Sequence, residues 1–447
     1  MRISSWGGMS NEAKSFRSPA FSSDIRQELS ARRPATRSKC LVVGNLRSYG
    51  DEVLCPDGHY VQTTRCDRIL QIDSREDRVT AECGIRFDVL QERLARWGYI
   101  IPVTPGTAHL TLGGAIANDV HGKNHHVAGT FGCYVEEFEL VRTSGEVLKC
   151  SPRENSELFA ASIGGMGLTG AITWATVQVR RIASPLLRVK STQFGQLADF
   201  FDLDLEGKQH EYSVAWIDCL AKGRSLGRGI YSVADHLASD AKPAAMSAAK
   251  PRRRARVPFY MPVSPVNRFT LSAMNSLYYR SHRTGLHTIP IEHWMYPLDS
   301  VQHWNRLYGR RGFHQFQSVV PRSEAQAAVS EMLKATSAAH QGSFLAVLKN
   351  FGNKESPGLM SFPMPGTTLA LDFPNRGKIT EDLLLELHRI TSNARGRLYP
   401  AKDGCSPANS LESGYPNFAR FARSIDPGIE SLQARRLGLT GRAADHG

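Results

Sequence analysis

The chain has 447 residues, of which 41% are hydrophobic and 22% charged, as in an ordinary globular protein with a sizeable core. This length suits two or three domains and, with this composition, excludes a single small module, a collagen-like repeat and a disordered chain. Lys and Arg total 55 against 42 Asp and Glu, and the net charge of +13 predicts an anionic partner: nucleic acid, a membrane surface or a phosphorylated substrate.

The first part of the chain, from residue 42 to residue 181, alternates short strands with tight turns. Apolar and polar residues alternate over 79–83, as in a half-buried strand. The next element is predicted to be an amphipathic helix with Gly98 as its C-cap. Its apolar face is expected to consist of Phe87, Leu90, Leu94 and Trp97.

A hairpin is predicted next, with strands at 135–141 and 146–150 around turn residues at 143–145. The segment 171–181 has the pattern of a further strand. Long alternation of strand and helix, which a doubly wound sheet needs, is missing. The pattern therefore predicts an α+β fold.

The composition changes after about residue 181. Residues 221–258 are rich in Ala, Gly, Ser, Pro and Arg, and we interpret them as a mobile loop or an insertion. Strands are expected at 315–320, 344–351 and 368–373.

Two helices are predicted in the later part of the chain. One starts at Ser323, which forms a capping-box pattern with Gln326. The other starts at Thr380 and carries a single apolar stripe. That stripe consists of Leu383, Leu384, Leu387 and Ile390.

Targeting and metal-binding signals are weak throughout the sequence. The N-terminal residues lack the apolar core of a signal peptide, and no stretch approaches the roughly 18 uninterrupted apolar residues of a membrane span. The eight cysteines are scattered, with no CxxC pair and no zinc spacing, which favours free thiols and no metal site. We expect a protein in the cytoplasm or at the inner face of the cell membrane.

Three glycine-rich segments are the strongest functional signal. They lie at 44–51, directly after an apolar strand, at 105–126 and at 163–170. Small residues after a strand let backbone N–H groups approach a phosphate, and Arg47 adds positive charge. Each segment alone is more often only a turn. None has the lysine-serine ending of a Walker motif or a GxGxxG in a strand–helix unit, so a P-loop or Rossmann fold is not expected.

In this order, the segments resemble those of the vanillyl-alcohol-oxidase-type (PCMH-type) FAD-binding superfamily. Within it, the chain is similar to the decaprenylphosphoryl-β-D-ribose 2′-oxidase family, from about Trp6 to beyond Pro427. The run His121–His126 is the most specific part, because related aldonolactone and alditol oxidases typically have HGTGG there. The matching strings are GNLRSYGD, PVTPGT, GGAIANDVHGKNHH, GGMGLTG, SVAWID, HWNRLYG, FHQFQSVVP, LMSFPMPG, LDFP and GRLYPAKD.

The resemblance implies a two-domain α+β fold. An FAD-binding domain would cover residues 1–183, and a substrate domain built on an antiparallel sheet would cover 184–395, with the mobile loop at about 221–258. The C-terminal segment, 396–447, would return to the FAD domain.

The resemblance also implies an FAD-dependent alcohol oxidoreductase. It would oxidise the 2′-hydroxyl of a polyprenylphosphoryl-β-D-ribose to the 2′-keto sugar, the first half of epimerisation to polyprenylphosphoryl arabinose in cell wall biosynthesis. A separate NAD(P)H-dependent short-chain reductase would complete the reaction, and the lipid substrate implies peripheral membrane association.

Two alternatives remain. The same flavin fold could act as an oxidase or dehydrogenase of a soluble sugar, alditol or aldonolactone. A basic nucleic-acid-binding protein is the other, motivated by the net charge and the cluster Arg252–Arg256. The segment 245–256 contains none of the interleaved aromatic residues that such a platform needs, so no nucleic-acid partner is expected.

The resemblance places FAD, bound non-covalently, among residues from the glycine-rich motifs and the C-terminal segment. These cofactor-binding candidates are Gly44, Arg47, Ser48, Tyr49, Gly50, Pro105, Gly106, Thr107, Gly113, Gly114, Ala117, Asn118, Asp119, His121, Gly122, Asn124, Gly164, Gly167, Gly170, Ile172 and Tyr399.

Alcohol oxidation by a flavin requires an acceptor for the hydroxyl proton. By resemblance, Lys402 lies beside the reacting carbon with Tyr399 close by, and His121 positions substrate and flavin. A lysine acts as a base only if burial or a neighbouring cation lowers its pKa, and otherwise it orients the hydroxyl as a donor.

The substrate wall is also assigned by resemblance. Alternation along one strand would point Gln315 and Gln317 to the same face. Mycobacterial members of the family have Asn and Cys in place of Thr368 and Ala370, which predicts altered hydrogen bonding in the pocket without loss of catalysis. Trp216 and Phe351 could equally be core residues. The full set is Lys123, Trp216, Gln315, Gln317, Lys349, Phe351, Thr368 and Ala370.

Overall fold

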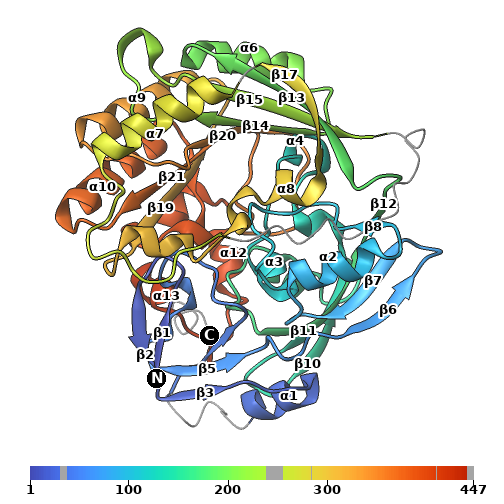
Figure 1. Cartoon of the computed structure of the whole chain (residues 1–447). Coiled ribbons are helices and arrows are strands. Elements are labelled where there is room, and N and C mark those ends of the chain that lie inside the picture. Colours follow the sequence, from blue (N-terminus) through green and yellow to red (C-terminus); the bar gives the residue numbers. More distant parts are fainter. Residues whose placement is uncertain (31–37, 238–254, 283, 409, 440–447) are drawn as a thin grey trace.

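Figure 1 shows the structure, a computed structural model that describes residues 1–30, 38–237, 255–282, 284–408 and 410–439. Helices combine with mainly antiparallel sheets, which confirms the α+β class. In this view a large sheet fills the upper half, and smaller sheets fill the lower half.

The strands of the lower half come from the first 181 residues, and the C-terminal segment packs against them. A five-stranded antiparallel sheet in the order β10-β9-β11-β7-β6 consists of β6 (Ile69–Asp73), β7 (Arg78–Glu82), β9 (Val135–Val141), β10 (Val147–Cys150) and β11 (Ala171–Gln178). A parallel sheet in the order β3-β5-β4 consists of β3 (Ser15–Arg17), β4 (Leu41–Val43) and β5 (His59–Gln62). Two small pairs are β1 (Arg2–Ser4) with β2 (Ser10–Glu12) and β8 (Tyr99–Ile100) with β12 (Arg180–Arg181).

Short helices connect these strands. They are α1 (Ser22–Ser30), η1 (Asp51–Val53), α2 (Phe87–Ala95), α3 (Leu112–Ala117), α4 (His125–Ala128), η2 (Phe131–Tyr134) and α5 (Ser156–Ser162). The predicted hairpin is present as β9 and β10, whereas the strand expected at 171–181 is divided into β11 and β12.

Helix α2 buries Phe87, Leu90 and Leu94, as expected. The prediction for Trp97 is wrong, because its side chain is 66% exposed. The helix ends at Ala95, with Arg96 rather than Gly98 as its C-cap, so Trp97 falls in the following turn and leaves the helical face. Gly98 lies in that turn in the left-handed region, with φ +75°.

The upper half contains an eight-stranded antiparallel sheet in the order β17-β13-β15-β14-β20-β21-β19-β22. Its strands are β13 (Leu186–Phe194), β14 (Tyr212–Ile217), β15 (Gly229–His236), β17 (Gly285–Pro290), β19 (Phe313–Val320), β20 (Val347–Phe351), β21 (Gly366–Pro374) and β22 (Arg397–Leu398). A parallel pair, β16 (Ala255–Arg256) and β18 (Val301–Gln302), lies outside it.

The interpretation of 221–258 as a loop or insertion is wrong for its first part. Strand β15 lies inside the large sheet between β13 and β14, and its Ile230, Tyr231, Val233 and Ala234 side chains are buried on both faces of the strand. Residues 238–254 lie outside the described residues, and so does most of the basic cluster at 252–256.

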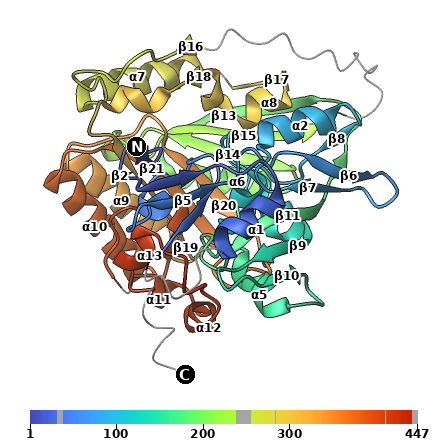
Figure 2. The same ribbon diagram turned by 90° about the horizontal axis from the view of Figure 1, so that it is seen from below.

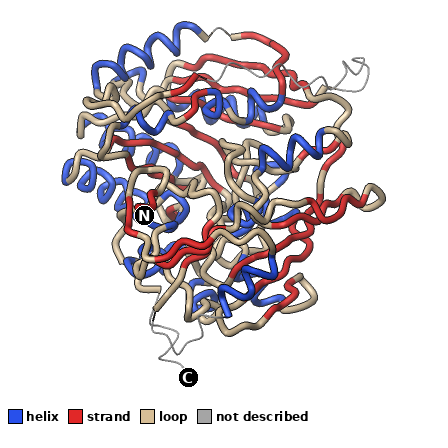
Figure 3. The backbone as a smooth tube through the Cα atoms, turned by 60° about the horizontal axis from the view of Figure 1, so that its bottom comes forward, coloured by secondary structure: helices blue, strands red, loops and turns tan. Residues whose placement is uncertain are grey.

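Helices line the outer face of the large sheet, as Figure 3 shows in blue around the red strands. Side chains of α6, α9 and α10 share a core with β14, β19, β20 and β21. The helices and turns of this half are α6 (Leu197–Gly207), η3 (Gly223–Ser225), α7 (Arg268–Ser281), α8 (Ile291–Met295), η4 (Pro297–Ser300), η5 (Trp304–Tyr308), α9 (Ala325–Ala338) and α10 (Lys378–Asn393).

Two predicted helix starts differ from the structure. Helix α9 begins at Ala325 with Glu324 as a cap that makes no side-chain hydrogen bond, so the capping box expected at Ser323 does not form. Helix α10 begins at Lys378, two residues before Thr380, whose hydroxyl instead donates to the carbonyl of Pro374 at 2.9 Å. The apolar stripe of α10 is buried as predicted.

The C-terminal segment crosses back to the lower half after β22. It comprises η6 (Pro400–Lys402), α11 (Ser410–Gly414), α12 (Phe418–Ala422) and α13 (Leu432–Arg436). Its apolar side chains share one core with β4 and β5, and Cys40 forms a parallel bridge with Ile429. Arg436 also pairs with Asp51 at 2.8 Å. This return carries Lys402 from the edge of the large sheet toward the glycine-rich loops.

Candidate functional site

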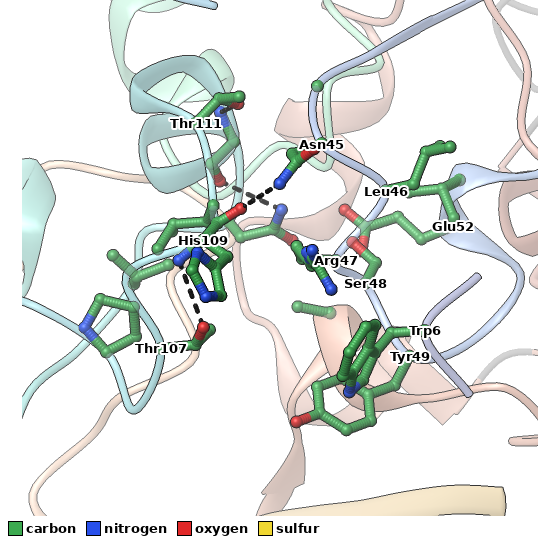
Figure 4. A pocket seen from close by; sticks show the side chains of 18 of the residues that line it. Trp6, Asn45, Leu46, Arg47, Ser48, Tyr49, Glu52, Thr107, His109 and Thr111 are labelled. Carbon is green, nitrogen blue, oxygen red and sulfur yellow. Dashed lines mark hydrogen bonds between the residues drawn. The ribbon is translucent and has the colours of Figure 1, made fainter. Parts of the chain in front are cut away.

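A cavity of about 590 Å³ lies between the two halves. All three glycine-rich segments contribute to its wall, together with β19, β20 and β21 of the large sheet, residues 298–304 and η6. Figure 4 shows part of this wall, with Arg47, Ser48 and Glu52 on one side of the view and Thr107 and His109 on the other.

The first glycine-rich segment forms a loop of open backbone donors. Strand β4 ends at Val43, and Leu46 then adopts a left-handed conformation with φ 51°, which is unfavourable for a residue with a Cβ atom. Among the described residues, no acceptor receives the backbone N–H groups of residues 45–48. The side chain of Asn45 donates to the carbonyl of His109 at 2.6 Å and links this loop to the second segment. Four consecutive free donors suit a phosphate group.

The second glycine-rich segment is held by a carboxylate from the other half. Asp299 accepts from the Thr107 hydroxyl and from the Ala108 backbone N–H, both at 2.8 Å. Behind it, Asp88 contacts the ring of His109 at 3.2 Å. These contacts fix the backbone of the segment while leaving Gly106 at the cavity.

The polar groups of the cavity wall fit an FAD. Nε of Arg47, Oε2 of Glu52 and Oδ1 of Asn118 are buried without a hydrogen-bond partner among the described residues. A Cβ atom added at Gly106 or Gly167 would meet nothing within 4 Å, so space lies against the backbone at both positions. Unpaired donors and acceptors beside bare backbone are what an extended, polar and phosphorylated cofactor would satisfy.

His121 lies in the cavity wall between two polar side chains from the large sheet. Its Nδ1 is 3.2 Å from Nζ of Lys349, and its Nε2 is 3.1 Å from Nε2 of Gln317. The rings of Phe351 and Tyr399 pack against it at 4.8 and 5.6 Å between centroids. Burial, reinforced by Lys349, holds the pKa of His121 well below its usual range, so the ring is neutral.

Lys402 enters the cavity from η6 with Nζ 3.8 Å from the centre of the Tyr49 ring. Burial lowers the pKa of Lys402 to about 8, although the carboxylates of Asp372 and Glu52 act in the opposite direction. Burial likewise lowers the pKa of Lys349 to about 7, with a contribution from Lys402. The cavity therefore holds two amines that can exchange a proton near neutral pH.

Two buried acids belong to this site, and sequence reasoning missed both. Burial raises the pKa of Glu52 to about 7, and it does the same for Asp372. Asp372 accepts a 2.5 Å hydrogen bond from Nε2 of Gln315 on the paired strand. Asp372 could have been found, because it follows Thr368 and Ala370 at the same two-residue spacing on β21. Nothing in the sequence around Glu52 distinguishes it.

Most of the predicted site residues meet at this one cavity. Those that line it are Gly44, Arg47, Ser48, Tyr49, Pro105, Gly106, Thr107, Gly113, Gly114, Ala117, Asn118, His121, Gly167, Gly170, Ile172, Gln315, Gln317, Lys349, Thr368, Ala370, Tyr399 and Lys402. Sequence reasoning also missed the lining residues Trp6, His109, Asp299 and Trp304.

Eight predicted residues lie outside this lining: Gly50, Asp119, Gly122, Asn124, Gly164, Lys123, Trp216 and Phe351. Lys123 donates to the carbonyl of Trp294, and burial lowers its pKa to about 7. Trp216 donates from Nε1 to the carbonyl of Phe344 at 3.0 Å. Phe351 is fully buried behind His121. These side chains support the wall from behind.

A separate cluster brings together His388, Asp403 and Cys405, whose ligand atoms lie within 4.8 Å of one another. Asp403 already accepts hydrogen bonds from Arg436, at 3.0 Å, and from the Ser406 hydroxyl. The positive charge of Arg436 beside the Asp403 carboxylate disfavours binding of a metal cation there, so we interpret the cluster as part of an ion-pair network.

Comparison with known proteins gives a consistent set of relatives. Residues 27–151 match the family model of the FAD binding domain. The chain is 35% identical over 408 residues to decaprenylphosphoryl-β-D-ribose oxidase of Mycolicibacterium smegmatis, covering 88% of each chain. It is 29% identical over 198 residues to L-gulonolactone oxidase of Mus musculus, covering 43% of each. It is 30% identical over 111 residues to Δ(24)-sterol reductase of Homo sapiens, covering 25% of this chain and 22% of the relative.

Proposed function

The chain belongs to the decaprenylphosphoryl-β-D-ribose oxidase family, and from this we propose that it oxidises the 2′-hydroxyl of a polyprenylphosphoryl-β-D-ribose to a ketone. It is an FAD-dependent oxidoreductase. One observation carries the proposal: a single cavity joins a loop of unpaired backbone donors to a wall with two lysines, Lys349 and Lys402, of lowered pKa.

We assign the two tasks of the enzyme to different parts of the chain. Residues 1–183 and 396–447 hold the FAD, and residues 184–395 form the substrate side. The shared core of the C-terminal helices with β4 and β5 supports this division. Strand β22, at Arg397–Leu398, still pairs with β19, so the chain leaves the large sheet after Leu398, two residues beyond the start of this segment.

The FAD-holding residues are those with unmet hydrogen-bonding capacity. The backbone donors of residues 45–48 and the guanidinium of Arg47 face phosphate, while Asn118 offers its free oxygen to a donor of the cofactor. When bound, FAD supplies the acceptor for the hydride that leaves the carbon bearing the hydroxyl. Both ring nitrogens of His121 already have partners, which supports non-covalent binding.

Lys402 takes the proton of the reacting hydroxyl. Its uncharged amine is available at and above about pH 8, and the Tyr49 ring holds Nζ in place. Tyr399 donates from its hydroxyl to the carbonyl of Asn118 at 2.9 Å and so fixes the backbone beside His121. These groups orient the alcohol and exclude water around it.

The substrate contacts come from β19, β20 and β21. Because the Nε2–H group of Gln315 donates a hydrogen bond to Asp372, the amide oxygen of Gln315 can accept one from a sugar hydroxyl. Lys349 is the candidate contact for phosphate. Thr368 and Ala370 have small side chains, which leaves room at the sheet for a pentose.

The test is a comparison of substrates with FAD-loaded enzyme. We expect kcat/KM for polyprenylphosphoryl-β-D-ribose to exceed that for free ribose, alditols and L-gulonolactone by at least about 10³-fold, because binding energy from the lipid phosphate is available only to the first. Turnover of a free alditol or lactone as fast as the lipid-linked ribose would contradict the proposal and favour a soluble substrate.

The keto product requires a second enzyme to complete epimerisation. Its reduction from the opposite face needs a hydride donor, and we assign this step to a separate NAD(P)H-dependent short-chain reductase. The proposal is supported by the chemistry of the product, since a ketone at C2′ is the reactant that such reductases take.

A lipid-linked substrate also implies contact with a membrane surface, which we place at α7. Phe269 and Leu277 are 74% and 70% exposed, and Arg268 and Arg280 lie on the same helix. Residues 241–291 contain nine Lys or Arg and no Asp or Glu. Figure 2 shows α7 at one border of the molecule beside β16 and β18. No helix among the described residues is long and apolar enough to cross a bilayer.

Replacing both apolar side chains tests this surface. The double variant Phe269→Ser, Leu277→Ser should bind vesicles containing phosphatidylglycerol at least about tenfold more weakly in a sedimentation assay, because each exposed apolar side chain inserted into lipid contributes about 2 kcal/mol. Leu205→Ser on α6, where the side chain is 60% exposed, is the control and should bind as the unaltered protein. Equal binding by all three proteins would exclude α7.

A further inference from the structure

The neighbours of His121 pose a hydrogen-bonding problem. Nε2 of Gln317 lies 3.1 Å from its Nε2, and Nζ of Lys349 lies 3.2 Å from its Nδ1. An amide nitrogen and a charged amine are donors only, and a neutral imidazole has one acceptor nitrogen. A neutral His121 therefore cannot accept from both neighbours at once. In one of the two contacts, His121 must therefore be the donor.

One arrangement keeps the Gln317 amide as the structure has it, and the other turns it; a charged Lys349 is compatible only with the turned amide, whereas an uncharged Lys349 permits either. In the first, Lys349 is uncharged and accepts from Nδ1–H of His121, while the Gln317 amide donates to Nε2. In the second, charged Lys349 donates to Nδ1, and Nε2–H donates to the Gln317 amide oxygen after that amide has turned. The ring carries one proton in both arrangements, on Nδ1 in the first and on Nε2 in the second. The second holds one more proton, on Lys349.

Thr368 decides whether the amide can turn. Nε2 of Gln317 lies 3.2 Å from the Thr368 hydroxyl, and both side chains are buried, with 6% and 1% exposure. A hydroxyl both accepts and donates, so it can accept from the amide nitrogen and, after the turn, donate to the amide oxygen. Lys349 and Thr368 are paired on adjacent strands, β20 and β21, which fixes the four side chains in one patch.

The charges around this patch make both arrangements accessible. Burial, with Lys402 nearby, lowers the pKa of Lys349 to about 7. Besides Lys402, the titratable groups that face the His121–Lys349 pair are His125, Lys123 and Tyr399; burial lowers the pKa of the first two and raises the pKa of Tyr399. Among the described residues, no carboxylate pairs with Lys349, His121 or His125. A small change of charge in the cavity can therefore shift the equilibrium between the two arrangements.

We propose that Lys349, His121, Gln317 and Thr368 form a reversible relay, in which a proton gained by Lys349 moves the His121 ring proton from Nδ1 to Nε2 and turns the Gln317 amide. The proton comes from the cavity and returns to it, so charge and atoms balance. The relay places a positive charge on the wall when an anion is present and removes it when the cavity is neutral.

The use of this relay rests on the proposed function. Alcohol oxidation releases a proton and leaves negative charge in the cavity, and a phosphorylated substrate brings negative charge with it. A cavity wall that gains one proton would stabilise the negative charge left by the reaction and the negative charge of the substrate phosphate. Thr368 is then a positioning residue, because it acts on the cavity through Gln317 and His121.

The relay is tested without substrate, in FAD-loaded protein labelled with nitrogen-15 histidine. Ring-nitrogen chemical shifts identify the protonated nitrogen of His121, and the signal is assigned by its loss in His121→Asn. We expect protonation at Nε2 at low pH and at Nδ1 at high pH, with a midpoint at about 7. Protonation of the same nitrogen from about pH 5 to about pH 9 would overturn the relay.

Thr368→Val and Thr368→Ser form the matched pair. With valine at 368, the Gln317 amide N–H has no acceptor when Lys349 is uncharged, whereas the Gln317 amide oxygen loses only one of its donors when Lys349 is charged. The uncharged arrangement is therefore destabilised more, and the midpoint of the titration should rise by about one pH unit. Serine keeps the hydroxyl and should keep the midpoint. Equal midpoints would remove Thr368 from the relay. Because no substrate is used, a failed lipid-ribose assay leaves these outcomes unchanged and counts only against the proposed function.

Discussion

Replacing Lys402 with methionine should leave FAD bound and slow reduction of the flavin by substrate by roughly 10²- to 10⁴-fold, the usual effect of losing a general base. Methionine fills a similar volume beside the Tyr49 ring but has no group that can take a proton. The measurement is stopped-flow absorbance of the flavin under anaerobic conditions. In the unaltered enzyme the same rate should rise with pH through about 8, because only uncharged Lys402 can accept the proton.

A matched control separates this effect from the loss of any lysine. Lys378 lies on the surface of α10 and pairs with Asp382 at 2.9 Å. Lys378→Met should therefore reduce its flavin as fast as the unaltered enzyme. Rapid flavin reduction in Lys402→Met would remove Lys402 from the mechanism, whereas loss of bound FAD from this variant would assign Lys402 to cofactor binding instead.

The second large effect is expected at Gly106, where a side chain would occupy space needed by FAD. A Cβ atom there meets nothing within 4 Å of the protein, so Gly106→Leu should fold normally. It should weaken FAD binding by about 10- to 100-fold, a loss of about 1.4 to 2.8 kcal/mol. Titration of the apoprotein with FAD, followed by flavin fluorescence, measures the dissociation constant, and thermal unfolding of the apoprotein checks the fold.

Gly285→Leu is the control for this substitution. Gly285 also has open space around its Cβ position, but it lies on the edge strand β17 and does not line the cavity. This variant should bind FAD as tightly as the unaltered protein. If Gly106→Leu also binds FAD normally, the second glycine-rich segment does not contact the cofactor.

The sequence was sufficient for the fold class and for FAD. The glycine-rich segments lie in loops and in helix α3, and their order along the chain, which resembles that of a known FAD-binding superfamily, is what indicated the cofactor. The predicted residues Gln315 and Gln317 alternate on a regular strand, so their shared face followed from the two-residue period. The roles given to the site residues stay predictions that the variants above test.

The errors have physical causes that lie beyond local sequence. Strand β15 has a loop-like composition on both sides, and only its pairing with β13 and β14 shows that it belongs to the sheet. Trp97 fits a helical period, but the helix ends before it. Glu52 becomes a buried acid because segments distant in sequence close over it, and no local pattern encodes that burial, whereas the position of Asp372 follows from the two-residue spacing on β21.

The most direct test of the central claim is anaerobic mixing of the FAD-loaded enzyme with polyprenylphosphoryl-β-D-ribose, followed by flavin absorbance and by mass analysis of the recovered lipid. We expect loss of the oxidised-flavin band and one equivalent of a sugar that has lost two hydrogens at C2′. A flavin that stays oxidised with this lipid but is reduced by L-gulonolactone or a free alditol would contradict the central claim.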